Sequence, residues 1–365
     1  MNTFFPLEFY SIIYYNFLLL LTFIVFFQSQ STLLESAYNL KNKSFIGLLL
    51  LLTIIFYIGL RPVNYRFGDM VIYNLQFNRF ANGYIPKYEK DVLFEFFLYQ
   101  FSKLGSATFF FFTCFLLYIL PLFAFAKKMF KDYWFYAFYI LVISFSFWAY
   151  GTNGIRNGIA TSVFLYGLSH KNKTTLFLIL LLSVFIHKSL SIPFGAFFIA
   201  KYYNKPKVYL IFWFLAIPLS LVLGGFWEGF FMKFGFGNED RLTGYFTSDQ
   251  KGLDAAVKVG FRWDFLLYSA TGVFAGWYYI VKKKFEDLYY NNLYGVYLIT
   301  NALWVLVIRA NFSNRFAYLS WFMLGIVIIY PLLKVKMFNN QNKVLGTVLL
   351  CYFAFTYIMN VILAK

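Results

Sequence analysis

Most of the chain consists of continuous apolar runs, each close to the roughly 20 residues that an α-helix needs to cross the hydrocarbon core of a bilayer. These runs lack the polar residue at every second position that is typical of membrane β-strands, so they predict helices. Hydrophobic residues make up 61% of the chain and charged residues 13%, about half the charged fraction of a soluble domain. The sequence therefore predicts an all-α, polytopic integral membrane protein.

We expect about twelve membrane-spanning helices. They are predicted at residues 9–28, 44–60, 105–126, 133–150, 153–169, 174–187, 189–203, 207–225, 263–281, 288–308, 315–333 and 344–363. The two short stretches on either side of His187 form either two crossings or a broken, re-entrant pair. No internal repeat and no low-complexity linker divides the chain, so residues 1–365 are predicted to form a single transmembrane domain.

Lysines mark the loops on one side of the predicted bundle. Lysine and arginine in short loops near span ends are retained in the cytoplasm. Sixteen of the 24 lysines, and no arginine, lie in alternate short loops, at Lys41, Lys43, Lys127, Lys128, Lys131, Lys171, Lys173, Lys201, Lys205, Lys207, Lys282, Lys283, Lys284, Lys334, Lys336 and Lys343. This alternation places both termini outside. The net charge of +17 is then mostly a topology signal and does not indicate a nucleic-acid-binding surface.

All eight arginines lie on the opposite, outer face in this topology, at Arg61, Arg66, Arg79, Arg156, Arg241, Arg262, Arg309 and Arg315. Lysine alone would satisfy the orientation rule, so a separate arginine population indicates a bound anion. A guanidinium group stays charged and holds phosphate oxygens through two parallel hydrogen bonds. The alternative for each arginine is a solvated loop position or an anchor in the lipid headgroups.

Two outer loops are long, at residues 61–104 and 226–262, and both lie on the predicted outer face. Loops longer than about 15 residues in a compact protein are usually functional or disordered. In the first loop, the spacing of apolar residues predicts amphipathic helices over 69–81 and 92–103, lying at the membrane interface. We expect the two loops to form the extracytoplasmic face of an active site.

The sequence offers no set of metal ligands. Two cysteines and two widely spaced histidines do not assemble a soft-ligand site, and no DxD pair of carboxylates occurs; only Glu89-Lys90-Asp91 approaches one. We therefore expect neither a metal nor another cofactor.

Five short segments lie at predicted outer helix ends. They are Arg61…Gly68-Asp69…Tyr73, Asn153-Gly154-Ile155-Arg156-Asn157, Phe185-Ile186-His187-Lys188-Ser189, Phe261-Arg262-Trp263-Asp264-Phe265 and Asn314-Arg315-Phe316. In their order, spacing and position they resemble the EpsG/Wzy group of bacterial polymerases, which make O-antigen, capsule or exopolysaccharide. Members of that group often have glutamine where this chain has Asn157.

The resemblance implies a glycosyltransferase of the bacterial cytoplasmic (inner) membrane, with a GT-C-like polymerase/ligase fold and an active site that faces the periplasm or outside. The growing glycan, carried on undecaprenyl diphosphate, would be transferred to the distal sugar of a lipid-linked repeat unit. The implied partners are the lipid-linked oligosaccharide donor and acceptor, membrane lipids and a chain-length-regulator protein.

Candidate substrate-binding residues follow from these segments. Breaking a glycosyl–diphosphate bond develops negative charge on the leaving group, which fixed cations stabilise. We expect Arg156 to act in catalysis by binding the diphosphate. The further predicted contacts with diphosphate or sugar are Arg61, Arg66, Tyr73, Asn153, Arg262, Asp264 and Arg315.

The acceptor hydroxyl loses its proton as it attacks the anomeric carbon, which requires a general base. The outer-face candidates are Asp69, Glu95, His187 and Asp264, of which Asp69 and His187 are predicted to be catalytic. Each has a structural alternative: an ion pair with an arginine for either aspartate, and a polar group at a helix break for His187.

Two other functions share these features. A flippase for lipid-linked oligosaccharides, or another transporter, would also have about twelve spans, but transporters place ionisable residues and broken helices near the midplane. Here almost every charge lies in a loop or at a span end. An O-antigen ligase shares the arginine and histidine chemistry, and the five segments favour a polymerase over a ligase.

Overall fold

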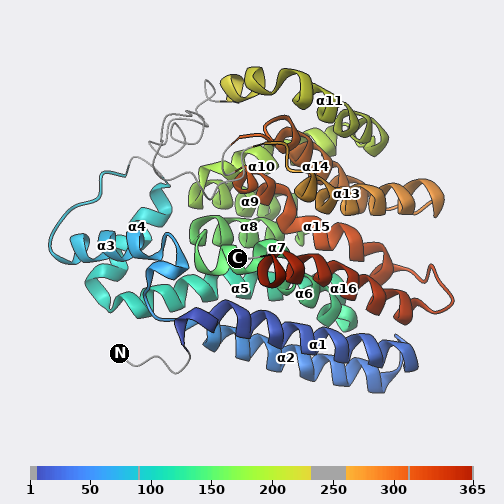
Figure 1. The fold of residues 1–365 in the computed structure, drawn as a ribbon, viewed down its shortest axis with the longest axis horizontal. Helices are drawn as coiled ribbons and strands as arrows, with labels where there is room; N and C mark the ends of the chain where they lie inside the picture. Colours follow the sequence, from blue (N-terminus) through green and yellow to red (C-terminus); the bar gives the residue numbers. More distant parts are fainter. Residues whose placement is uncertain (1–5, 89–90, 232–259, 311–312, 364–365) are drawn as a thin grey trace. The chain divides into compact units, whose positions relative to one another are not determined.

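The computed structural model describes residues 6–88, 91–231, 260–310 and 313–363, and these residues form helices and no strand (Figure 1). The prediction of an all-α protein is confirmed for this part of the chain. Its contacts group into two compact units. Unit 1 comprises Met1–Ser191 and Leu332–Lys365, and unit 2 comprises Ile192–Pro331. The prediction of a single transmembrane domain stays a prediction.

Unit 1 contains ten α-helices among its described residues. They are α1 (Tyr10–Ser31), α2 (Ala37–Gly59), α3 (Met70–Ala81), α4 (Val92–Leu104), α5 (Ala107–Phe130), α6 (Trp134–Val142), α7 (Phe145–Thr152), α8 (Ile155–Leu168), α9 (Lys173–Ile186) and α16 (Gln341–Tyr357). Short 3₁₀ turns lie at Leu7–Phe9, Tyr65–Phe67, Lys131–Tyr133 and Lys188–Leu190, and α16 continues as a π-helix over Ile358–Ile362.

Unit 2 contains α10 (Ser191–Tyr202), α11 (Pro206–Phe231), α13 (Trp263–Trp277), α14 (Leu288–Leu306) and α15 (Asn314–Lys334) as far as Pro331. A π-helix over Tyr278–Lys282 extends α13. Within this unit α14 packs against α11 and α13.

Side-chain caps explain where several helices begin. Ser36, Ser106, Asn172 and Asp287 each precede a helix, and each side chain accepts a hydrogen bond from the backbone N–H three residues later. These bonds satisfy N–H groups that have no partner within the helix. Polar residues at the borders of apolar runs therefore set the starts of α2, α5, α9 and α14.

Every predicted span coincides with helical structure, and the span predicted at 133–150 is divided into α6 and α7. In the described residues, six segments are long and apolar enough to cross a membrane. These are Leu7–Ser31, Ala37–Gly59, Ala107–Val142, Pro206–Phe231, Asn314–Lys334 and Gln341–Ile362. The number of about twelve crossings and the GT-C-like fold stay predictions.

The segment Ala107–Val142 contains a reversal of the chain. Lys131 follows α5 with φ at 47°, and Trp134 of α6 then packs edge-on against Phe123 of α5, with ring centroids 5.1 Å apart. This reversal corresponds to the loop predicted between the spans 105–126 and 133–150.

The core of unit 1 lies around α5 and α6. All nine residues of α6 are buried, which agrees with a helix that is apolar on every side. Helix α5 packs against α2, α4, α6 and α8, and α8 packs against α9. The start of α8 and the end of α9 are thereby fixed to the same core.

The two amphipathic helices predicted in the first long loop are confirmed as α3 and α4. They pack against each other, and α4 also packs against α9. The buried face of α3 carries Met70, Tyr73, Phe77 and Phe80, at helical spacing. Their position at a membrane interface stays a prediction.

A buried polar network connects four helices of unit 2. The side chain of Asn301 on α14 accepts a hydrogen bond from Trp213 of α11 (2.7 Å) and donates to Ser269 of α13 (3.1 Å) and Ser320 of α15 (2.9 Å). Trp321 of α15 donates to the same Ser269 hydroxyl (2.7 Å). Hydrogen bonds of this kind hold helices together where the surroundings are apolar.

We predict that Asn301→Leu destabilises unit 2 by about 2 kcal/mol, because similar volume is kept while buried donors and acceptors lose their partner. The measurement is thermal unfolding of the detergent-purified protein. Thr271→Val is the matched control, since exposed Thr271 bonds to the Tyr268 carbonyl of its own helix. Equal melting temperatures for Asn301→Leu and the wild type would refute this role.

Candidate functional site

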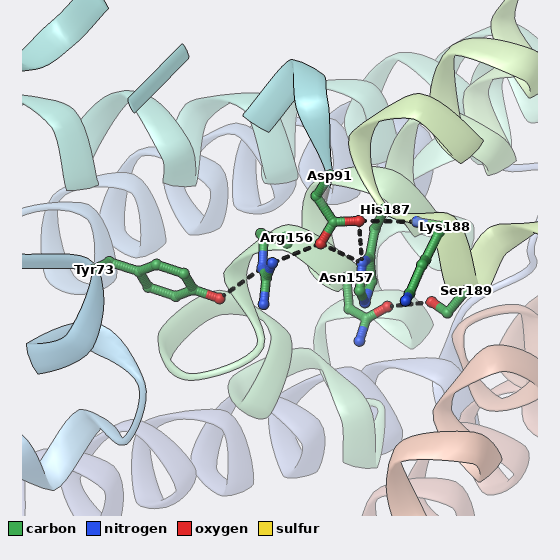
Figure 2. A network of polar contacts seen from close by, with 7 residues as sticks. All are labelled: Tyr73, Asp91, Arg156, Asn157, His187, Lys188 and Ser189. Carbon is green, nitrogen blue, oxygen red and sulfur yellow. Dashed lines mark hydrogen bonds and ion pairs between the residues drawn. The ribbon is translucent and has the colours of Figure 1, made fainter. Parts of the chain in front are cut away.

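A buried carboxylate, that of Asp91, lies at the centre of a polar cluster in unit 1 (Figure 2). Its Oδ2 is 2.6 Å from Nη1 of Arg156 and 2.9 Å from Nδ1 of His187. Its Oδ1 is 3.0 Å from the same histidine nitrogen and accepts a hydrogen bond from the backbone N–H of Lys188 at 3.1 Å. The cluster therefore joins three segments that are far apart in the sequence.

Helix ends position each member of the cluster. Asp91 immediately precedes α4, Arg156 lies in the first turn of α8, and His187 immediately follows α9. Arg156 is 65 residues from Asp91, and His187 is 96 residues from it. The packing of α4 on α9 and of α8 on α9 brings these ends together.

The backbone of Asp91 adopts the left-handed conformation, with φ at 46° and ψ at 52°. Non-glycine residues rarely adopt this region, although aspartate tolerates it better than most. Such conformations persist where the surrounding structure enforces them, and they are frequent at functional sites. Here the enforcing contacts are the three donors that hold the carboxylate.

Electrostatics keep Asp91 ionised although its side chain is only 2% exposed. Burial by itself raises the pKa of Asp91. The hydrogen bond and charge of His187, the charge of Arg156 and the N–H of Lys188 together lower this pKa by more than burial raises it. The net pKa lies below the ordinary value for aspartate. An ionised carboxylate can only accept hydrogen bonds.

This acceptor determines the tautomer of His187. Since both Asp91 oxygens face Nδ1, that nitrogen carries a proton, and in a neutral imidazole the lone pair is then on Nε2. Within the described residues, Nε2 of His187 has no hydrogen-bond partner. The side chain is 11% exposed, so a partly buried imidazole presents an acceptor nitrogen.

Arg156 is oriented by two neighbours at once. Its Nη1 contacts Asp91, and its Nε donates to the hydroxyl of Tyr73 at 3.0 Å. Its side chain remains 27% exposed. A cation in the first turn of a helix is unfavourable next to the positive end of the helix dipole, so the placement of Arg156 requires an anion nearby. Asp91 is such an anion.

Tyr73 stays protonated beside this pair. Burial raises its pKa, and the charge and hydrogen bond of Arg156, which lower it, do not cancel that effect. Its oxygen accepts the hydrogen bond from Arg156, so its own O–H can donate to a further group. Tyr73 therefore combines an acceptor for the arginine with a donor for a ligand.

Asn153 belongs to the second of the five sequence motifs, and its side chain bonds to the first motif, which contains Gly68 and Asp69. Its Oδ1 accepts the backbone N–H of Asp69 at 2.8 Å. Gly68 precedes this contact with φ at +62°, and a Cβ there would lie 2.4 Å from the Asn153 side chain. Only glycine fits this close approach. Asp69 is held at the start of α3 by this bond, and its predicted catalytic role stays a prediction.

Asn157 lies one residue beyond Arg156 and accepts a hydrogen bond from Ser189 Oγ at 3.0 Å (Figure 2). The second and third motifs are therefore joined twice, through Asp91 and through this amide. The first three of the five sequence motifs meet in unit 1.

Arg61 is buried, with 1% of its surface exposed. It donates to the carbonyl of Ile58 (2.8 Å) at the end of α2 and to that of Thr152 (3.3 Å) at the end of α7. Carbonyl ends of helices favour a cation. These contacts fasten two helix ends, and the predicted contact of Arg61 with substrate stays a prediction.

Arg66 is exposed and lies 3.9 Å from Glu8, a pair that contributes little on a surface. The alternative for Asp69, an ion pair with an arginine such as Arg66, stays a prediction. The predicted contact of Arg66 with substrate also stays a prediction.

The remaining two motifs lie in unit 2. Arg262 forms two hydrogen bonds with Asp264, Nε to Oδ1 at 2.9 Å and Nη2 to Oδ2 at 2.7 Å, and its guanidinium lies 3.6 Å from the Phe265 ring centre. The arginine partner expected for Asp264 is thus found. Arg315 lies in the first turn of α15, and its predicted contact with substrate stays a prediction. Arg241 lies outside the described residues.

Asp91 was not among the predicted site residues. It had been noted only within Glu89-Lys90-Asp91, a near match to a metal-binding pair. The available signal was an aspartate directly before an amphipathic helix in an arginine-rich loop, a position typical of a helix cap. In the described residues, no group of three or more His, Cys, Asp or Glu is arranged to hold a metal ion.

The model of the EpsG family matches residues 44–365, a range that includes all five motifs. No curated protein and no solved structure matches the chain significantly.

We predict that Asp91→Asn lowers the free energy of unfolding by about 3 kcal/mol at neutral pH, because Arg156 and His187 lose a buried counter-ion. The folded-state pKa of Asp91 lies below its unfolded value, so this stabilisation is complete above about pH 4 and is lost as the pH falls further. Melting temperatures of wild type and variant should therefore converge as the pH falls below about 4. Asp132→Asn, at an exposed aspartate, is the control and should melt like the wild type.

Proposed function

Because the chain belongs to the EpsG family, we propose that it is a polysaccharide polymerase of the cytoplasmic membrane. In this proposal it transfers a growing glycan from undecaprenyl diphosphate to the distal sugar of a lipid-linked repeat unit at the outer face. The observation that carries the proposal is the Asp91–His187 pair, with Arg156 on the same carboxylate. A chain-length regulator and membrane lipids are further proposed partners.

The reaction exchanges one bond at the anomeric carbon. The acceptor hydroxyl oxygen forms a bond to the anomeric carbon, and the bond from that carbon to the diphosphate oxygen breaks. The leaving undecaprenyl diphosphate takes the bonding electron pair, and the hydroxyl proton passes to a base. The site must therefore offer a proton acceptor and stabilise a developing anion.

His187 is the proposed proton acceptor. Its Nδ1 proton is held by Asp91, which leaves the Nε2 lone pair for the acceptor hydroxyl. As the imidazole becomes positively charged, the adjacent carboxylate stabilises it, which is the part that the buried aspartate plays in a serine-protease triad. Asp91 therefore acts through His187 and need not touch the substrate.

Arg156 is the proposed contact for the leaving diphosphate. Asp91 and Tyr73 fix the plane of its guanidinium, so it needs little reorganisation as charge develops. The amides in the first turn of α8 add the positive end of a helix dipole at the same place. Arg66 is a further proposed diphosphate ligand, and we propose that arginines replace a metal ion.

The alternatives differ in product. A ligase would transfer finished glycan to a different lipid acceptor and would not lengthen lipid-linked repeat units. A flippase would form no glycosidic bond. The described site favours bond formation, because a buried carboxylate orients His187 with an acceptor nitrogen available and Arg156 lies on the same carboxylate.

We predict that His187→Gln in proteoliposomes lowers the rate of chain growth on lipid-linked repeat units by roughly 10²–10⁴-fold, the usual contribution of a general base. Asp91→Asn should lower the rate of chain growth per folded molecule by a similar factor, because this variant favours the wrong tautomer of His187. The measurement is the length distribution of glycan on gels, with EDTA present. Asp132→Asn, at an exposed aspartate outside the cluster, is the control.

Free imidazole should restore part of the activity of His187→Ala, which a merely structural histidine would not show. An unchanged glycan ladder for His187→Gln would exclude His187 as the base. Loss of wild-type activity in EDTA, restored by a divalent cation, would exclude the metal-independent mechanism.

We predict that Arg156→Lys lowers polymerisation by about 10²-fold, because lysine keeps the charge but cannot bind both Asp91 and a diphosphate through a planar fork. Tyr73→Phe keeps the ring below the guanidinium and removes one hydrogen bond, so this variant should lower polymerisation by about tenfold. Cells with Arg156→Lys should accumulate single repeat units at normal protein levels. Near-normal long chains in that variant would contradict the proposed role.

A further inference from the structure

A polar cavity of about 410 Å³ lies in unit 1, where the turn between α1 and α2 meets the segment that joins α15 to α16. Its walls come from residues 30–36, 332–336 and 339–343, with Tyr133 beside them. In Figure 1 the two turns lie at the same end of α1, α2 and α16. None of the five motifs contributes to this cavity.

The cavity lies at the opposite end of α2 from the candidate active site. Helix α2 has 23 residues and is therefore about 35 Å long, close to the thickness of a bilayer core. Ala37 begins α2 beside the cavity, whereas Arg61 follows its other end. If α2 crosses the bilayer, the cavity lies at headgroup depth on the lysine-rich side, which the sequence places in the cytoplasm.

The lining carries more positive than negative charge. Lys334, Lys336 and Lys343 line the cavity together with a single glutamate, Glu35. The Nζ of Lys334 donates to the carbonyl of Met129, so the stem of this lysine is held in place. Lys336 and Lys343 are exposed. A lysine-lined cavity at this depth favours an anion.

The first turn of α16 adds backbone donors. Its N-cap residue, Asn340, makes no side-chain cap, and Gln341, Asn342 and Lys343 carry the first N–H groups of the 17-residue helix. All four residues line the cavity. Lys343 in this turn is a cation at the positive end of a helix dipole, which costs stability unless an anion binds there.

The walls are built by specific hydrogen bonds rather than by a loose loop. Gln341 accepts the backbone N–H groups of Met337 and Phe338 through Oε1 and donates to two carbonyls of the same segment through Nε2. Asn342 donates to the carbonyl and hydroxyl of Thr32 in the other wall. The two turns are therefore held at a fixed separation.

We propose that this cavity binds a phosphate group, as carried by the headgroup of an anionic phospholipid or by free phosphate. Lys336 and Lys343 supply charge, and the first-turn amides of α16 donate hydrogen bonds to the phosphate oxygens. Leu33, which lines the cavity and is 76% exposed, is placed to contact an acyl chain. The bound phosphate offsets the repulsion between Lys343 and the helix dipole.

The test is thermal unfolding of delipidated protein in neutral detergent, titrated with phosphatidylglycerol, with phosphatidylcholine or with inorganic phosphate. The double variant Lys336→Gln/Lys343→Gln should lose about tenfold or more in apparent affinity for the ligand that stabilises the wild type. Lys171→Gln/Lys173→Gln removes the same charge from another exposed lysine loop and should bind like the wild type.

Stabilisation by phosphatidylglycerol alone identifies the lipid headgroup as the source, whereas equal stabilisation by inorganic phosphate identifies a free anion. Equal loss of affinity in both double variants would overturn the proposal, because it would reveal only general attraction of lysines to anions. Unchanged affinity in Lys336→Gln/Lys343→Gln would overturn it as well. Without ligand, this variant should melt no lower than the wild type, which separates loss of binding from loss of folding.

Discussion

A buried carboxylate is the constraint on which the candidate active site depends. Asp91 is removed from water, and an uncompensated charge there would cost several kcal/mol. Its partners come from the start of α8 and from the residues that follow α9. Because all of them must reach the same two oxygens, three helix ends are held at one place. The same charge fixes the tautomer of His187, so fold and chemistry depend on one interaction.

Local patterns in the sequence predicted the elements well. Apolar runs bounded by polar caps gave the helices, and the helical spacing of apolar residues gave α3 and α4 within a loop that has few other landmarks. The pairing of Asp264 with a nearby arginine was also predictable, because Arg262 is two residues away in the sequence. These features depend on neighbours in the chain, which sequence reasoning can evaluate.

Features that depend on tertiary packing were not predictable in this way. Asp91 gains its importance from His187, 96 residues away, and its position directly before a helix does not by itself indicate that partner. Arg61 was expected among the substrate ligands, and its burial against the carbonyls of Ile58 and Thr152 follows only from the meeting of two helix ends. Every residue has a backbone carbonyl, so the sequence does not indicate which carbonyls will accept a hydrogen bond from Arg61.

The arginines that first indicated an anion therefore have distinct surroundings. Arg61 fastens two helix ends, Arg262 is held by two bonds to a carboxylate in its own motif, and Arg156 is oriented by Asp91 and Tyr73 while part of its side chain stays accessible. A cation that is already fixed needs less reorganisation when a leaving group becomes charged, so a few oriented arginines stabilise it better than many mobile ones. In the proposed function, Asp91 and Asp264 serve that purpose, because they hold the guanidinium groups of Arg156 and Arg262 in place before substrate binds.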